Sequence, residues 1–187
     1  MPLAPEAFMK IAFLAFLTFF AFHALAAPIP ATSSSSLIAA DLGMFISEYG
    51  FTINAAGTTW VHTPPPKDMP ALTTLYRSPT LSHGVQPSLT VRVDPLKEEI
   101  SLNKYAKQWM KDYHRLGFEV LASKPLKISG QSAFLVDVIN REAAKQLRQV
   151  VFVKNRTAVV LTCRDHRENF DETVHKCNEI IKKFKWR

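Results

Sequence analysis

The sequence predicts an α+β protein in which an antiparallel sheet of about six to eight strands is flanked by helices as an α/β/α sandwich. Three observations predict this class. Four strand patterns follow one another between residues 118 and 163, an amphipathic helix pattern precedes them, and a second apolar helix pattern closes the chain. Because each helix has one apolar face, each is expected to cover the sheet.

The first part of the sheet is expected to consist of short strands at residues 51–54, 58–63, 72–78 and 88–93. The first two flank a turn at residues 55–57 and predict a hairpin, with Phe51 and Trp60 as aromatic anchors. Proline-rich segments at residues 64–70 and 79–87 follow. Proline removes backbone donors, so both segments are expected to be loops.

The clearest helix pattern spans residues 101–117, where Ser101 can cap the start and Gly117 can end the helix. Its apolar stripe consists of Leu102, Tyr105, Ala106, Trp109, Met110, Tyr113 and Leu116. Its outward side carries four basic residues at the same spacing, Lys104, Lys107, Lys111 and Arg115. They form a candidate partner-binding face, although a charged outer face is also typical of any surface helix.

Four longer strands are expected after this helix, at residues 118–128, 132–140, 147–154 and 157–163. The last of them is apolar almost throughout, which is typical of a central strand covered on both faces. A lysine-rich closing helix is predicted over residues 170–186. Asn169, with Glu172 three residues later, predicts a capping box at its start.

Residues 1–26 have the pattern of a secretory signal peptide, with the charge of Lys10, an apolar run and small residues up to Ala26. A true start at Met9 rather than Met1 would place the positive charge at the front. The apolar run is too short to cross a bilayer, so we expect no transmembrane span in the mature chain. The protein is therefore expected to be periplasmic or secreted.

The rest of the chain is expected to consist of a leader and one folded domain. Residues 27–36 are rich in proline and serine and predict a flexible leader, and residues 37–187 predict a single α+β domain. The formal net charge is +7. A basic exported protein suits an anionic envelope component or an acidic protein partner, whereas nucleic acid is not expected outside the cell. The charge can also serve solubility alone.

The two cysteines, Cys163 and Cys177, allow three interpretations. An even count in an exported protein favours a disulfide, and a helix that reverses over its own strand would bring the two together. Two reduced buried thiols are an alternative, and a reactive thiol is a third. A nucleophilic cysteine needs a depressed pKa and access to solvent, and the apolar helix face of Cys177 predicts neither.

Other residue patterns give little sign of catalysis or of a bound group. His166 lies three residues after Cys163, but the surrounding charged residues fit a solvated helix start equally well. Glu172 and His175 share a helix face, yet two ligands are too few for a metal ion. No phosphate-binding glycine loop and no hydrolase motif occurs in the sequence. We therefore expect no catalytic residue, no metal and no cofactor, and we predict that the protein is not an enzyme.

Three stretches resemble sequences of proteins with the PsbP-like fold. Photosystem II extrinsic subunits share this fold with a Ran-binding nuclear import factor and some bacterial envelope proteins. The three stretches are EYGFTINAAGTTW at residues 48–60, LKISGQSAFLV at residues 126–136 and FDETVHKCNEIIKKFKW at residues 170–186. The resemblance implies binding or assembly rather than catalysis. The family's usual proline before Trp60 is absent, and the segment by which the photosystem subunit engages its partner is not visible, so that specific role is not implied.

The sequence thus predicts an exported, noncatalytic binding or assembly module of the cell envelope or extracellular space, with an unknown partner. Contact with this partner would use the basic helix face or one of the two proline-rich loops. A small secreted hydrolase that uses the polar cluster TCRDHRE at residues 162–168 is the first alternative. A structural envelope component is the second.

Overall fold

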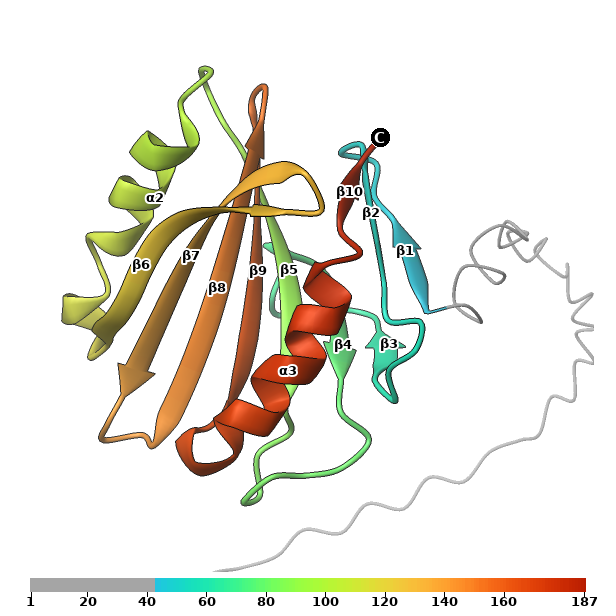
Figure 1. Ribbon diagram of the computed structural model, residues 1–187, viewed down its shortest axis with the longest axis vertical. Coiled ribbons are helices and arrows are strands. Elements are labelled where there is room, and N and C mark those ends of the chain that lie inside the picture. Colours follow the sequence, from blue (N-terminus) through green and yellow to red (C-terminus); the bar gives the residue numbers. More distant parts are fainter. Residues whose placement is uncertain (1–42) are drawn as a thin grey trace, which may run out of the picture. The chain divides into compact units, whose positions relative to one another are not determined.

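The computed structural model describes residues 43–187, whose ten strands form two antiparallel sheets (Figure 1). The large sheet has the strand order β3 (Val61–Thr63), β4 (Leu72–Arg77), β5 (Ser88–Pro95), β9 (Thr157–His166), β8 (Lys145–Lys154), β7 (Gln131–Asn140) and β6 (Glu119–Ile128). The small sheet has the order β1 (Met44–Ile46), β2 (Phe51–Asn54) and β10 (Lys185–Trp186). The predicted signal peptide and leader lie outside the described residues.

Two α-helices cover opposite faces of the large sheet, α2 (Leu102–Met110) and α3 (Phe170–Ile181) (Figure 1). Side chains alternate between the two faces of a strand. In β8, Val150 and Phe152 therefore pack in the core below α3, while Val151 packs in the core below α2. The predicted α/β/α sandwich is confirmed.

Strand β9 lies between β5 and β8, and the four residues from Ala158 to Leu161 are all buried. Its register with β8 pairs Leu161 with Val150, and its register with β5 pairs Leu161 with Val91. The prediction of a central strand covered on both faces is confirmed. The strand continues to His166, three residues beyond the predicted end at Cys163.

The predicted hairpin between residues 51–54 and 58–63 is wrong. Strand β2 pairs with β1 and β10 in the small sheet, whereas β3 pairs with β4 in the large sheet. The backbone N–H and the hydroxyl of Thr58 both donate to the carbonyl oxygen of Ala55, at 3.0 and 2.7 Å. The chain turns there, and Trp60 enters the core between the two strands.

The first helix is shorter than the pattern predicts. Ser101 caps its start as expected, with its hydroxyl oxygen accepting from the Lys104 N–H. The α-helix ends at Met110, and a 3₁₀ turn, η1 (His114–Leu116), follows before Gly117 adopts a φ of 77°. A 3₁₀ turn has about three residues per turn instead of 3.6. Leu116 therefore leaves the apolar stripe and is exposed.

The closing helix also differs from its prediction at both ends. The Asn169 side chain donates to Ser82 Oγ at 2.8 Å and makes no capping hydrogen bond, so the predicted capping box with Glu172 is absent. The helix ends at Ile181. Residues 185–186 form β10 instead, because pairing with β2 lets Trp186 pack edge-on against Phe184.

Candidate binding surface

Strand β6 is an open edge of the large sheet. Among residues 43–187 it pairs with β7 alone, and its first seven residues are all exposed. An edge strand presents unpaired backbone N–H and C=O groups, to which an extended segment of another chain can add. Lys124, Pro125 and Lys127 protect the second half of the edge, since proline and lysine oppose strand addition. The first half has no lysine or proline and carries Val120 and Leu121, where a register shift leaves Leu121 without a partner in β7.

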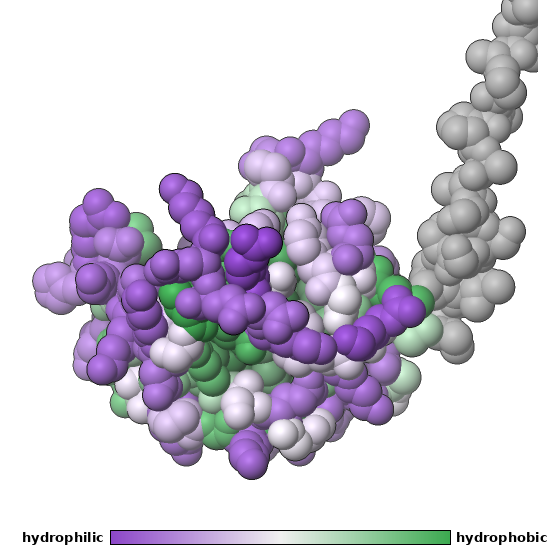
Figure 2. Space-filling model, turned by 90° about the horizontal axis from the view of Figure 1, so that it is seen from above, coloured by the Kyte–Doolittle hydropathy of each residue, from purple (hydrophilic) through white to green (hydrophobic). Residues whose placement is uncertain are grey.

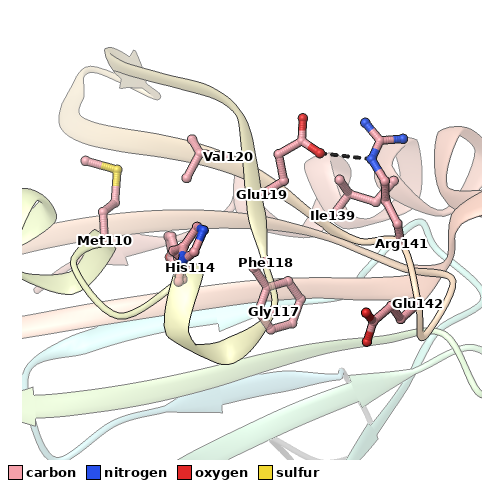
Figure 3. Close-up of a pocket in the computed structure, with 10 residues that line it drawn as sticks. Met110, His114, Gly117, Phe118, Glu119, Val120, Ile139, Arg141 and Glu142 are labelled. Atoms are coloured by element: carbon pink, nitrogen blue, oxygen red, sulfur yellow. Dashed lines mark hydrogen bonds and ion pairs between the residues drawn. The ribbon is translucent and has the colours of Figure 1, made fainter.

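A pocket of about 600 Å³ opens beside this first half of β6, between the strand and the end of α2 (Figure 3). Its apolar lining includes Met110, Phe118 and Ile139. At the rim, the Arg141 guanidinium donates to the Glu119 carboxylate at 2.9 Å. This ion pair lowers the pKa of Glu119 and raises the pKa of Arg141. The pocket therefore combines an apolar lining with a charged pair at its rim.

Three exposed apolar side chains lie in or next to the chain segment that lines the pocket. Leu116, Val120 and Leu121 are 59%, 41% and 46% exposed. Val120 also lines the pocket, and Leu116 directly precedes the lining residue Gly117. Exposed apolar residues that form a group are typical of interaction sites, whereas isolated ones are ordinary. We call Leu116, Glu119, Val120, Leu121 and Arg141 the β6 edge surface.

The predicted basic face lies on α2 and the turn after it, and α2 ends beside the pocket. Its members Lys104, Lys107, Lys111 and Arg115 are all exposed. Lys104 lies 3.5 Å from a Glu98 oxygen and Arg115 lies 3.1 Å from an Asp112 oxygen, so carboxylates partly neutralise these two. His114, one residue before Arg115, already lines the pocket. The basic face therefore ends, along the chain, next to a residue that lines the pocket.

A buried polar network that no sequence pattern predicts holds this helix on the sheet. The indole N–H of Trp109 donates to Gln149 Oε1 at 2.7 Å, and the Tyr113 hydroxyl donates to the same oxygen. Gln149 in turn donates to Thr162 Oγ1 at 3.1 Å. Burial raises the pKa of Tyr113 above its ordinary range. A single glutamine in a strand gives no sequence signal for such a network.

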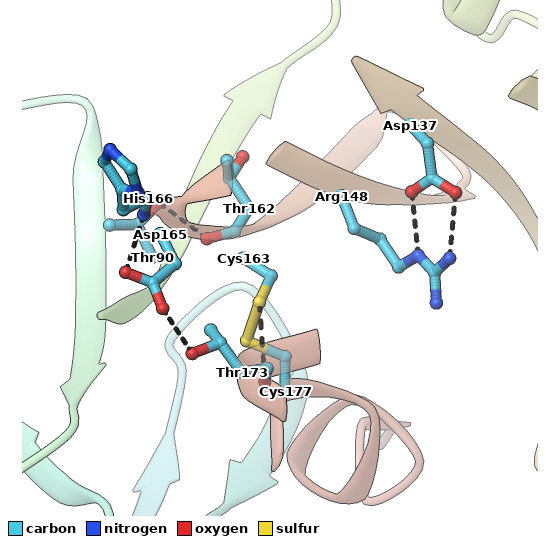
Figure 4. Close-up of a disulfide and its surroundings, with 9 residues drawn as sticks. All are labelled: Thr90, Asp137, Arg148, Thr162, Cys163, Asp165, His166, Thr173 and Cys177. Carbon is cyan, nitrogen blue, oxygen red and sulfur yellow. Dashed lines mark hydrogen bonds and ion pairs between the residues drawn. A yellow bond between two sulfur atoms is a disulfide. The ribbon is translucent and has the colours of Figure 1, made fainter. Parts of the chain in front are cut away.

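The cysteine and histidine pair considered from the sequence is not a nucleophilic site. Cys163 forms a disulfide with Cys177, and neither residue is exposed (Figure 4). A disulfide sulfur carries no thiolate. Asp165, expected to be solvated, is fully buried and accepts from the Thr173 hydroxyl at 2.6 Å. The segment TCRDHRE therefore contributes to the core.

Hydrophilic side chains cover most of the face at the β6–β7 turn, with hydrophobic residues visible between them (Figure 2). One hollow near this turn, of about 490 Å³, lies between the start of α2 and β6 and includes Leu102 and Leu126. Two of the hollows that border β6 thus lie against α2. Within residues 43–187, no helix has the length and apolar character needed to cross a membrane.

Comparison with known proteins gives the fold. No protein-family model matches the sequence, and no curated protein matches it. The solution structure of cyanobacterial PsbP (CyanoP) from Synechocystis sp. PCC 6803 matches with a TM-score of 0.56 and 10% identity, over 77% of this chain and 91% of that chain. The chain has a PsbP-like fold. The predicted resemblance is confirmed.

Two other structures share this PsbP-like fold. A protein of unknown function from Pseudomonas aeruginosa matches with a TM-score of 0.55 and 13% identity, over 77% of this chain and 96% of that chain. A protein from Bacteroides thetaiotaomicron matches with a TM-score of 0.54 and 12% identity, over 78% of this chain but 48% of that chain. At these identities the likeness shows the fold alone.

Proposed function

We propose that this protein is an exported, noncatalytic binding or assembly module of the cell envelope or extracellular space. The PsbP-like fold is consistent with such a module. Export is supported by the signal-peptide pattern of residues 1–26 and by a disulfide, which persists in oxidising compartments. The hydrolase alternative loses its nucleophile, because Cys163 is bonded to Cys177.

The β6 edge surface is the observation that carries this proposal. Its open backbone groups can pair with an added strand, and the adjacent pocket can take one apolar side chain of that strand. The neighbouring basic face favours a partner segment with acidic residues. The ligand is therefore an extended, apolar and acidic polypeptide segment of a partner protein.

A capture experiment tests this function. The purified protein is immobilised and exposed to an envelope extract of the source organism, and separately to anionic lipid vesicles, at low and moderate salt. Leu121→Asp places a charge on the β6 edge surface, while Val61→Asp does the same on β3, the opposite edge of the sheet, where Val61 is 57% exposed. We expect a retained protein that Leu121→Asp loses and Val61→Asp keeps.

The outcome at the two salt concentrations separates the contribution of the basic face from that of the apolar and backbone contacts. Exposed charges are screened within about 10 Å at 0.1 M salt, so the basic face should lose influence while apolar and backbone contacts persist. Retention only by vesicles would assign the basic face to a lipid surface instead. No retained protein or vesicle at either salt concentration would contradict a binding function.

A further inference from the structure

Two histidines and a glutamate outside the β6 edge surface converge on one point. Within the part of the chain that the structure describes, His83, His166 and Glu168 each offer one ligand atom, and these atoms lie within 4.8 Å of one another. The two imidazole rings stack with centroids 4.7 Å apart. His83 Nε2 also lies 3.5 Å from a Glu168 carboxylate oxygen. All three residues are at least partly exposed to solvent.

Local structure fixes the loop that carries His83. Ser82 and Val85 exchange two backbone hydrogen bonds of 2.7 Å, which closes a tight turn around His83 and Gly84. Ser82 also accepts the hydrogen bond from Asn169 at the start of α3. This contact fastens the turn beside His166.

The other two ligands come from the junction between β9 and α3. His166 is the last residue of β9, where it pairs with Lys145. Its backbone N–H donates to the buried Asp165 carboxylate at 2.6 Å. Glu168 follows in the 3₁₀ turn η2 (Arg167–Asn169). The Cys163–Cys177 disulfide joins β9 to α3 close to this junction. The cluster is thus supported on two sides by the fold.

The ligand types point to a transition metal. Imidazole nitrogen with a carboxylate oxygen suits Zn²⁺ and related ions, whereas Mg²⁺ and Ca²⁺ prefer oxygen ligands alone. The His166 Nδ1 lone pair accepts only a long hydrogen bond of 3.4 Å from the backbone N–H of Glu168. A metal ion that binds this lone pair therefore replaces only a weak hydrogen bond. The ion pair between His83 and Glu168 is exposed and contributes little by itself.

We propose that His83, His166 and Glu168 bind one divalent transition-metal ion of the Zn²⁺ class. Three protein ligands leave coordination positions for water or for a group of a partner. The bound ion ties the β4–β5 loop to the start of α3. This site is independent of the proposed binding function, since none of its ligands belongs to the β6 edge surface.

Titration calorimetry of the untagged protein with zinc chloride tests the site. We expect saturable binding of one ion per chain. His83→Ala, His166→Ala and Glu168→Gln should each weaken the affinity by more than the roughly tenfold loss that follows removal of an outer-shell partner, since each removes a ligand itself. The matched control is His175→Ala, an exposed histidine of α3 that lies beside Glu172 on the helix, and it should leave the affinity unchanged.

Two readouts complete the test. Circular dichroism checks that the variants remain folded, and titration with Co²⁺ should produce the visible absorption of a low-coordinate site in the parent chain but not in His166→Ala. Zinc should also raise the melting temperature of the parent and of His175→Ala. The proposal is overturned if no saturable zinc binding occurs, or if the three site variants bind zinc as tightly as the parent.

Discussion

Cys163 in β9 is bonded to Cys177 in α3, and neither residue is accessible to solvent. The bond closes a short stretch of chain, with a separation of 14 residues along the sequence. It joins the central strand of the large sheet to the helix that covers this strand. It therefore secures the core on the α3 side, including the junction that carries His166.

Removal of this bond should destabilise the protein. Closing a loop of this length is worth roughly 3 kcal/mol in the chain-entropy account of disulfides. We expect the double variant Cys163→Ala, Cys177→Ala to lower the free energy of unfolding by about that amount, measured by guanidinium denaturation. Reductant should destabilise the parent but not the double variant. Equal denaturation midpoints for the two proteins would contradict this account.

The hydrogen bond between Thr173 and the buried Asp165 should contribute more to the stability of the fold than the hydrogen bond of Thr90 does. Thr173→Val keeps the shape but leaves a buried carboxylate short of a donor, and hydrogen bonds to charged groups contribute about 1.5–3 kcal/mol. Thr90→Val is the matched control, because its hydroxyl bond to the Thr162 carbonyl is long, at 3.5 Å (Figure 4). Thermal unfolding that ranks the two substitutions equally would refute the special role of Asp165.

The stability of the protein should fall steeply in alkali. Burial raises the pKa of Tyr76, Tyr105 and Tyr113 above the ordinary value of 10.0. The unfolded chain then loses these protons first, so their contribution is complete below about pH 10 and decreases above it, by up to about 1.4 kcal/mol per pH unit for each tyrosine.

Phenolate absorbance during an alkaline titration checks this expectation. A Tyr49→Phe variant leaves only the three buried tyrosines, since the sequence has four in all. Their ionisation should coincide with loss of the circular dichroism signal. Phenolate formation in a chain that keeps its folded spectrum would show that these hydroxyl groups are accessible.

Local patterns predicted much of the fold. The apolar spacing of residues 101–110 and the four successive strand patterns are local signals, and both helices and the central position of β9 followed from them. The pairing of β2 did not, because it depends on β10 at the opposite end of the chain. Nor does any local signal show that Trp60 separates β2 from β3 by entering the core.

The candidate sites were less predictable for the same reason. The basic residues of α2 are visible in the sequence, but the exposed edge of β6 follows from its position at the end of the strand order. No metal site is predicted from the sequence. His83 and His166 stack across two segments that are far apart in the chain, and the bond from Asn169 to Ser82 joins the same two segments.

Amide hydrogen exchange, with and without the captured partner, measures the central claim directly. In the free protein, the amides of residues 119–123 in β6 should exchange faster than those of β8 and β9, because β6 is open on one side. Partner binding should protect this first half of β6 and leave β3 unchanged. Protection confined to β3, or no change along β6 in a saturated complex, would contradict a binding surface at the β6 edge.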